Sequence, residues 1–160
     1  MASKGNDGLQ PTGVPQVAGS KVVILKTAWN KHITDALADG CKKILEEYGV
    51  VYKEVTVPGA VELTFAVSHA SKDLTFSADA FITLGCVIRG DTPHFEYVCQ
   101  IVTQGITQLN TQLTKPVIFG VLTVNTETQA MERIGGIHGH KGEEAALTAI
   151  QMIDWMKNRL

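Results

Sequence analysis

Four apolar segments alternate with segments of helical periodicity along this chain, and this order is the strongest constraint on its fold. The apolar segments have the length and the β-branched content of buried strands; they are Lys21–Thr27, Val50–Val57, Asp79–Gly85 and Pro116–Leu122. Parallel strands require crossover connections, which are usually helices, so regular alternation indicates a parallel sheet covered on both faces. We therefore expect an α/β fold, a three-layer α/β/α sandwich with a four-stranded parallel sheet.

The helical spacing of apolar residues predicts where the helices lie. One helix follows Asn30 and stops near Gly49, and the others cover Ala60–Lys72, Pro93 to about Leu113, Thr126–Ile134 and Glu143–Leu160. We expect Gly135–Gly142 (GGIHGHKG) to be a loop that no regular element would tolerate. Residues 1–20, rich in Gly, Pro and Ser, are predicted to be a flexible N-terminal tail, in which Val14–Val17 is a candidate extra edge strand. Residues 21–160 then form a single domain.

Composition excludes several classes of partner and location. With 160 residues the chain is long enough for one domain with its own core, and no segment is apolar enough to cross a bilayer or to serve as a signal peptide. The net charge of −2, without any lysine or arginine cluster, gives no reason to expect nucleic acid or a membrane as a partner. The three cysteines lack CxxC spacing and indicate free thiols in a reducing compartment, so we expect a cytoplasmic protein. Cys86 and Cys99 are expected to be small buried residues.

The topology predicts where a ligand binds. In parallel sheets of this kind, ligands bind beyond the carboxyl ends of the strands. That rule groups four segments that are distant in sequence and hold most of the unusual residues; they are Trp29–Asn30, Pro58–Glu62, Cys86–His94 and the residues after Leu122. We therefore expect a binding site at this edge of the sheet.

The segment between the third strand and its helix carries the most specific chemistry. Thr92 is suited to be the N-cap and Pro93 the first helical residue. A helix start presents unpaired N–H groups and a partial positive charge, which suit an anion, and Arg89 lies nearby. His94 falls in the first turn and can exchange protons near neutral pH. An anion-binding site beside a group that can exchange protons fits chemistry on a phosphorylated substrate. The alternative is an ordinary strand–helix connection with a surface histidine.

Three further residues each have a structural and a functional interpretation. Trp29 would stack on a planar ring or belong to the rim of the core. Asn30 would contact a ligand or simply cap the helix that follows it. Glu62 would accept hydrogen bonds from ligand hydroxyls or amides, or compensate the dipole of its helix.

Basic residues late in the chain share this ambiguity. Arg133 would clamp a phosphate with its guanidinium fork or be a solvated residue at a helix end. Lys141, in a glycine-rich loop before the last helix, would likewise attract an anion or remain in solvent. His138 and His140 are alternate residues in that loop, but without a third ligand or HExxH spacing we expect no metal site.

One stretch, Gly85–Tyr97 (GCVIRGDTPHFEY), is similar to the central motif of the 6,7-dimethyl-8-ribityllumazine synthase family. Supporting matches follow the order and spacing of that family from the first strand to the last helix; they are Ala28–Asn30, Val57–Leu63, Pro116–Thr123, Gln129–Arg133 and Lys141–Ala146. The resemblance implies a flavodoxin-like three-layer sandwich, in agreement with the alternation of strands and helices.

The resemblance also implies an activity and partners. It implies a transferase of riboflavin biosynthesis that condenses 5-amino-6-(D-ribitylamino)uracil with 3,4-dihydroxy-2-butanone 4-phosphate. The product is 6,7-dimethyl-8-ribityllumazine, phosphate and water are released, and no cofactor or metal is used. The family forms homopentamers, many of which assemble further into an icosahedral capsid (a 60-mer), and the compact loop before the last helix permits this here. Riboflavin synthase is implied as a further partner.

The resemblance assigns roles to individual residues. His94 matches the proton-transfer residue of the family. The pyrimidine and ribityl groups would be bound by residues from several strand ends, with Trp29 stacked on the pyrimidine; these residues are Trp29, Asn30, Ala60, Val61, Glu62, Cys86, Val87, Ile88 and Phe119. The phosphate would be bound by Asp91, Thr92, Arg133 and Lys141. Phe119 and Arg133 are expected to act in the site of a neighbouring subunit.

Three residues depart from the usual pattern of the family. Val61 replaces an aromatic or polar residue, and His140 replaces a common asparagine. Asp91 places an acid beside the expected phosphate-binding site, so we expect its side chain to point away or to cap the turn.

Two other classes of function remain open at this point. One is a flavin- or phosphate-binding module, which would not need His94 and Arg133 together, and the other is a structural shell.

Overall fold

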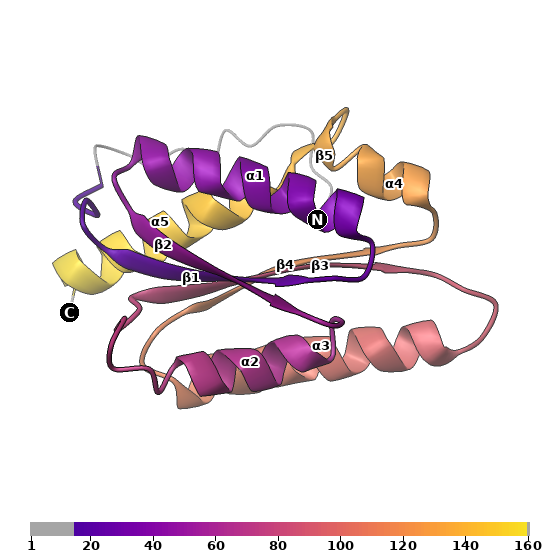
Figure 1. The fold of residues 1–160 in the computed structure, drawn as a ribbon, viewed down its shortest axis with the longest axis horizontal. Coiled ribbons are helices and arrows are strands. Elements are labelled where there is room, and N and C mark those ends of the chain that lie inside the picture. Colours follow the sequence, from indigo (N-terminus) through magenta and orange to yellow (C-terminus); the bar gives the residue numbers. More distant parts are fainter. Residues whose placement is uncertain (1–14, 160) are drawn as a thin grey trace.

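The sheet has the predicted size and direction. A computed structural model describes residues 15–159 (Figure 1). Within them, four parallel strands lie in the order β2-β1-β3-β4; they are β1 (Lys21–Thr27), β2 (Val51–Val57), β3 (Ala80–Ile88) and β4 (Val117–Val124). The central strands β1 and β3 are almost wholly buried, as strands covered on both faces should be, whereas β2 is an exposed edge strand. The prediction of a four-stranded parallel sheet is confirmed.

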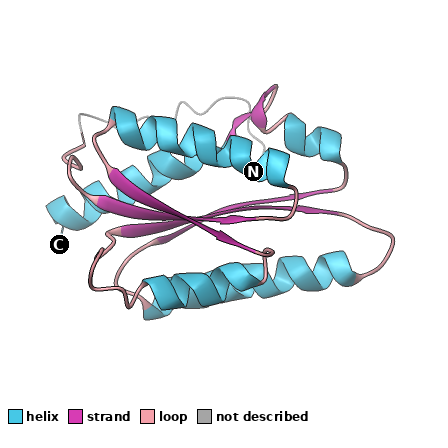
Figure 2. Cartoon of the chain, in the orientation of Figure 1, coloured by secondary structure: helices cyan, strands magenta, loops and turns pink. Residues whose placement is uncertain are grey.

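Helices cover both faces of the sheet and make the three layers of the predicted sandwich (Figures 1 and 2). α1 (Lys31–Glu47) and α5 (Lys141–Arg159) pack together on one face, and α2 (Glu62–Ala70) and α3 (His94–Gln112) lie on the other. The short α4 (Glu127–Met131) follows β4. The strand order reverses between β1 and β3, so the topological switch point lies between their carboxyl ends. None of the helices described here is both long enough and apolar enough to span a membrane.

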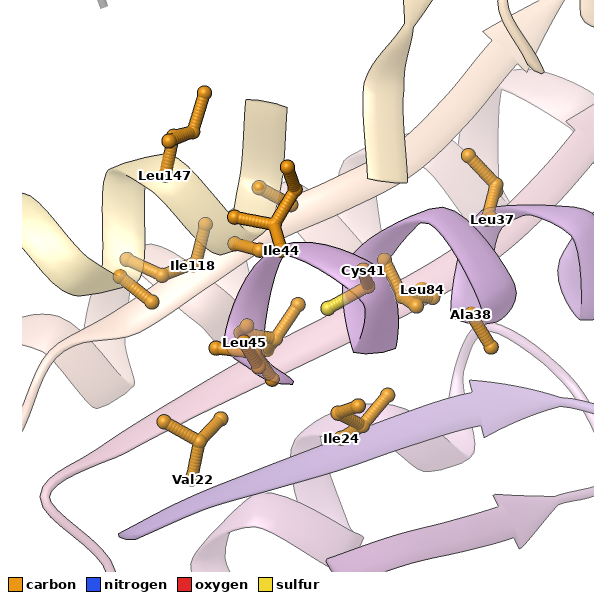
Figure 3. Close-up of a cluster of buried hydrophobic side chains, with 14 of the residues drawn as sticks. Val22, Ile24, Leu37, Ala38, Cys41, Ile44, Leu45, Leu84, Ile118 and Leu147 are labelled. Atoms are coloured by element: carbon orange, nitrogen blue, oxygen red, sulfur yellow. The ribbon is translucent and has the colours of Figure 1, made fainter. Parts of the chain in front are cut away.

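Each central strand divides its side chains between two cores. Val22 and Ile24 of β1 pack toward α1 and α5, while Val23 and Leu25 pack toward α2 and α3. Figure 3 shows the first core, where α1 meets the sheet through Leu37, Cys41, Leu45, Ile24 and Leu84. Because side chains alternate along a strand, a shift of one residue would exchange the two cores, and this fixes the register of β1.

β3 continues beyond its predicted end. The strand was predicted to end at Gly85, but β3 runs on to Ile88, and its last three residues pair with β4. Gly85 lies within the sheet, where a Cβ would stand 3.3 Å from Cγ2 of Thr27 and 3.4 Å from Cγ1 of Val121. The glycine therefore serves close packing and not a turn, and β3 carries its last residues out to the edge where ligands bind.

The segment before the last helix was predicted to be an irregular loop, and this prediction is wrong. β5 (Ile134–Gly136) and β6 (Gly139–His140) pair as an antiparallel hairpin. Gly135 and Gly139 have φ angles of 111° and 74°, a region that glycine enters without strain, so these residues permit the hairpin. α5 then begins at Lys141, ahead of the predicted start.

The packed domain begins before Lys21, where its start was predicted. Val17 is completely buried, and the backbone N–H of Gln16 donates to a carboxylate oxygen of Asp154 in α5 at 2.9 Å. Residues 15–20 form no strand. The rest of the predicted tail, including Val14 of the candidate edge strand, lies outside the described residues.

A cluster of charges joins β1 and β2 to α1. The ammonium of Lys26 lies 2.7 Å from a carboxylate oxygen of Asp35 and 2.8 Å from one of Glu54, and Lys31 also pairs with Asp35. Hydrogen bonds from Lys26 and Lys31 lower the pKa of Asp35 from 3.8 to about 2. A carboxyl with a lowered pKa stabilises the fold when it is ionised, so its contribution is present above about pH 4 and is lost as the pH falls toward 2.

We expect Asp35→Asn to lower stability near neutral pH and to lose this difference in acid. Urea unfolding of both proteins from about pH 6 down to about pH 2 measures the difference, which should shrink as the wild-type carboxyl is protonated. Asp39→Asn, which removes an exposed carboxylate of the same helix that pairs with Lys42, is the matched control and should show a small difference. A difference for Asp35→Asn that stays constant down to about pH 2 would contradict the assignment.

Candidate active site

A cleft lies at the carboxyl ends of β1, β2 and β3, at the topological switch point. Its volume is about 410 Å³, in the range of small-molecule sites. Its walls come from the last residues of β1 and β3, from residues that follow the three strands, and from the starts of α2 and α3; they are Thr27, Trp29, Asn30, Gly59, Ala60, Val61, Glu62, Cys86, Val87, Ile88, Gly90, Thr92, His94, Phe95 and Val98. Three of the four segments that the topology was expected to group therefore meet in one cavity.

Trp29 stands at the wall of this cleft. The residue is 73 % exposed, so it does not belong to the core. Its backbone is held on both sides, because its N–H donates to the carbonyl of Pro58 at 3.2 Å and its carbonyl accepts from the hydroxyl of Thr27 at 3.2 Å. An exposed indole on an anchored backbone is suited to stack on a planar ligand.

Asn30 occupies the N-cap position of α1, as predicted, but its side chain does not cap the helix. Its backbone is left-handed, with φ 55° and ψ 46°, and its side chain makes no capping hydrogen bond. Its side-chain N–H instead donates to the carbonyl of Cys86 at 2.9 Å, which ties the β1–α1 connection to β3. Asparagine adopts a left-handed backbone more readily than most residues. The Asn30 side chain therefore links the carboxyl ends of β1 and β3 at the switch point.

The start of α2 forms a second wall of the cleft. Ala60 and Val61 precede Glu62, the first residue of the helix, and all three line the cavity. A Cβ on Gly59 would stand 3.0 Å from Oε2 of Glu62 and 3.8 Å from Cδ1 of Trp29. The missing side chain at Gly59 therefore lets a carboxylate and an indole approach the same small volume, where the carboxylate can accept hydrogen bonds from ligand hydroxyls.

The start of α3 forms the third wall. The helix begins at His94, with Pro93 at the N-cap position and no capping side chain, so the prediction of Thr92 as N-cap is wrong by one residue. Thr92 and His94 are both exposed and both line the cleft. The partial positive charge of the helix start therefore lies beside the imidazole, as an anion site with a proton carrier requires. Asp91 is exposed and does not line the cleft.

The cysteines are poor nucleophiles. Cys41, Cys86 and Cys99 are free thiols. Burial raises the pKa of Cys41 to about 12 and that of Cys86 to about 11, and it also raises the pKa of Cys99. Because the thiolate is the reactive form, Cys86 contributes an apolar wall and a backbone carbonyl to the cleft, and not a nucleophile.

A second and larger groove runs along β4, the edge strand on the other side of the sheet. Its volume is about 690 Å³, and it shares no lining residue with the cleft. Phe119, Arg133 and Lys141 line this groove, and Phe119 is 43 % exposed. Within one chain the structure therefore separates these three residues from the other candidate site residues.

Hydrogen bonds hold the two basic residues of the groove. One N–H of the Arg133 guanidinium donates to the carbonyl of Gln129 at 2.7 Å. Nζ of Lys141 lies 2.7 Å from each carboxylate oxygen of Glu144, and its backbone N–H donates to the carbonyl of Arg133 at 2.8 Å. The two cations thus stand at the base of the β5–β6 hairpin, and each lies near a carboxylate, since Nη1 of Arg133 is 3.9 Å from an oxygen of Glu132.

Part of the cleft was not predicted. Phe95 and Val98 have the helical spacing of the residues by which α3 faces its core, yet both line the cleft. The first turn of a helix that starts at a ligand-binding edge can contact the ligand and the core with one face, and periodicity does not distinguish these roles. Thr27 also lines the cleft, because it is the last residue of β1 and so lies at the edge of the sheet where the cleft opens.

The histidines of the hairpin have protein partners. Nε2 of His138 lies 3.8 Å from a carboxylate oxygen of Glu132, and Nδ1 of His140 lies 3.4 Å from the backbone nitrogen of Glu143. Across residues 15–159, no three His, Cys, Asp or Glu side chains gather closely enough to hold a metal ion.

The fold and the cleft define a class of protein. They are those of a three-layer α/β protein that binds a small ligand at the switch point of a parallel sheet, beside an aromatic ring, a carboxylate and a histidine at a helix start. The sequence model of the 6,7-dimethyl-8-ribityllumazine synthase family matches residues 19–157. The chain belongs to this family.

Curated relatives carry the same description. A 6,7-dimethyl-8-ribityllumazine synthase of Parabacteroides distasonis is 47 % identical over 145 residues, which cover 89 % of each chain. That of Bacteroides fragilis is 48 % identical over 144 residues, covering 87 % of this chain and 99 % of the relative. That of Porphyromonas gingivalis is 49 % identical over 142 residues, covering 87 % of each chain.

Proposed function

We propose that this protein condenses 5-amino-6-(D-ribitylamino)uracil with 3,4-dihydroxy-2-butanone 4-phosphate to 6,7-dimethyl-8-ribityllumazine, in riboflavin biosynthesis. The observation that carries the proposal is the cleft in which Trp29, Glu62 and His94 meet beside a helix start, in a chain of the lumazine synthase family. Phosphate and water leave, and the reaction needs neither a metal nor an organic cofactor.

The cleft offers a place for the uracil substrate. Trp29 would stack on the pyrimidine, and backbone groups of residues 86–88, at the end of β3, would bind its polar edge. The hydroxyls of the ribityl chain would donate to Glu62, beside the backbone of residues 60–61. On this proposal the 5-amino group of the uracil would point toward the start of α3.

The chemistry requires the amine to attack a ketone and phosphate to leave. The start of α3 with Thr92, together with an arginine fork, would hold the phosphate and stabilise the charge that develops as it departs. His94 would carry protons to and from the reacting groups at the same place. Orientation of two bound substrates supplies a large part of the acceleration.

On this proposal a second copy of the chain completes the phosphate site. Phe119, Arg133 and Lys141 line the β4 groove, which has no residue in common with the cleft of the same chain. In a closed ring, the β4 groove of one copy would face the cleft of the next and bring Arg133 to Thr92. We propose a homopentamer that can assemble into an icosahedral capsid.

The proposal includes a cytoplasmic location and riboflavin synthase as a partner.

The activity is tested by mixing the purified protein with both substrates and recording the absorbance of the lumazine product. We expect product that requires both substrates and the protein. A binding module would retain one ligand without making product. A structural shell would scatter light as a large particle without turnover, and either result would reject the enzyme.

Sharing of the site between copies has its own test. His94→Ala and Arg133→Ala chains are unfolded, mixed and refolded together. In a ring, random mixing gives roughly a quarter of the sites an intact His94 from one copy and an intact Arg133 from the next. With the phosphorylated substrate kept below its wild-type KM, where each variant alone is slow, the activity of the mixture should rise above that of either variant. No rise over separately refolded variants would place both residues in the site of one chain.

We expect His94→Ala to slow turnover without abolishing it. Proton transfer by a placed side chain contributes about 10²-fold or more, while substrate orientation is retained, so the single-turnover rate should fall about 10²-fold. His69→Ala, an exposed histidine of α2 that stacks on Phe65, is the matched control and should leave the rate unchanged. A wild-type single-turnover rate in His94→Ala would remove this residue from the mechanism.

A further inference from the structure

Arg89 lies where the β3–α3 connection approaches the β4–α4 turn, yet it lines neither cavity. It directly follows β3 and begins the connection that leads to Thr92 and His94. Its backbone N–H donates to the carbonyl of Val124 at 2.9 Å, which continues the pairing of β3 with β4 by one residue. Its position at this edge of the sheet is therefore fixed by the sheet itself.

The side chain of Arg89 contacts three groups on two sides. Nε donates to the side-chain oxygen of Asn125, directly after β4, at 2.9 Å. Nη1 donates to the carboxylate of Glu96 in the first turn of α3. The guanidinium carbon lies 4.2 Å from the centre of the Phe95 ring. A planar fork with an aromatic ring against its face has a defined orientation, which a lysine could not reproduce.

These contacts fix the turn that carries the imidazole. Phe95 and Glu96 directly follow His94, so holding both of them from Arg89 limits how far the first turn of α3 can move. The Arg89 guanidinium is also a cation beside the Glu96 carboxylate, and the hydrogen bond that it donates lowers the pKa of Glu96. An unpaired carboxylate at a helix start would oppose the binding of an anion there.

The contacts of Arg89 extend in the other direction to Arg133. The backbone N–H of Asn125 donates to the side-chain oxygen of Gln129 at 2.8 Å. The carbonyl of Gln129 accepts from the Arg133 guanidinium at 2.7 Å. Arg89 is therefore the residue at which the β3–α3 connection and the β4–α4 turn are joined by side-chain hydrogen bonds.

We propose that Arg89 is a positioning residue, which holds the first turn of α3, and with it His94, against the β4–α4 turn and does not bind the substrate phosphate. The inference rests on the proposed function and adds a residue to it. The side chains of Arg89 and Glu96 are 42 % and 53 % exposed, and ion pairs at such exposure contribute little to stability. Loss of Arg89 should therefore change catalysis more than unfolding.

Kinetics separates positioning from anion binding. We expect Arg89→Ala to lower kcat about tenfold, to leave KM for each substrate within about twofold, and to leave the urea midpoint unchanged. Arg89→Lys keeps the charge but cannot contact Asn125 and Glu96 together, so it should recover less than roughly half of the lost rate. Lys72→Ala, which removes an exposed cation after the far end of α2, is the control and should match the wild type.

Two kinetic results would overturn the proposal. One is a raised KM for the phosphorylated substrate at unchanged kcat, which would make Arg89 an anion ligand. The other is full activity of Arg89→Lys. Hydrogen exchange adds a readout that needs no turnover, because amides of residues 97–100, the first whose N–H groups donate within α3, should exchange faster in Arg89→Ala than in Lys72→Ala. Unchanged exchange rejects the positioning role even in a protein that makes no product, whereas absence of product in the wild type rejects the proposed function alone.

Discussion

Replacing Arg133 by alanine is expected to raise KM for the phosphorylated substrate about a hundredfold and to leave KM for the uracil substrate nearly unchanged. A guanidinium fork on a phosphate makes paired, charge-assisted hydrogen bonds, each with a contribution of about 1.5–3 kcal/mol, and a hundredfold change corresponds to about 2.7 kcal/mol. Steady-state kinetics with the other substrate saturating measures each KM separately.

Two comparisons make this result specific. Arg133→Lys keeps the charge and loses the fork, so its KM for the phosphorylated substrate should lie between those of the wild type and Arg133→Ala. Because the Arg133 guanidinium also donates to the carbonyl of Gln129 in α4, urea unfolding of each variant shows whether the loss of this hydrogen bond destabilises the fold. An equal rise in both KM values would count against a role in binding phosphate.

Gly142→Ala is expected to destabilise the protein by about 3 kcal/mol. Gly142 lies in the first turn of α5, where an added Cβ would overlap the carbonyl oxygen of Leu37 in α1 and stand 2.8 Å from its carbon. The obstacle is helix backbone, so α1 and α5 would have to separate. Alanine is otherwise favoured over glycine in a helix by about 1 kcal/mol, so the expected sign is opposite to helix propensity. Urea unfolding measures the difference.

The matched control is Gly90→Ala. No atom lies within 4 Å of a Cβ added to Gly90, so this substitution should change stability by less than about 0.5 kcal/mol. A Gly142→Ala protein as stable as the wild type would show that α1 and α5 can move apart without cost.

The layers of the fold follow directly from the sequence, whereas the ends of its elements do not. β1 (KVVILKT) shows why, because a strand that is apolar on both faces must be covered on both, and only helices supply the connections. Gly85 shows the limit. Whether a glycine ends a strand or lies inside a sheet depends on the side chains that face it, here Thr27 and Val121, and these come from other strands. The prediction of an irregular loop at Gly135–Gly142 failed for a similar reason. The positive φ angles that favour glycine occur in loops and also in the tight turns of hairpins.

The location of the cleft could be predicted from the sequence, but the side-chain contacts within it could not. The rule on carboxyl ends of strands brought Trp29 and His94 together correctly, as lining residues of one cavity. Asn30 was expected to cap its helix or to contact a ligand, but its side chain bonds a carbonyl 56 residues away, a pairing that no local pattern contains. The same rule grouped the residues after Leu122 with the cleft, because it identifies an edge of the sheet and not which side of β4 a residue occupies, and only the family resemblance assigned Arg133 to a neighbouring subunit.

The separation of the cleft from the β4 groove has a kinetic meaning. If the two halves of a working site come from different copies, a solitary chain is inactive however well it is folded. Specific activity would then fall on dilution as the ring dissociates, and it would return at higher protein concentration without any change in the chain. A newly synthesised copy would begin catalysis only when it finds its neighbours.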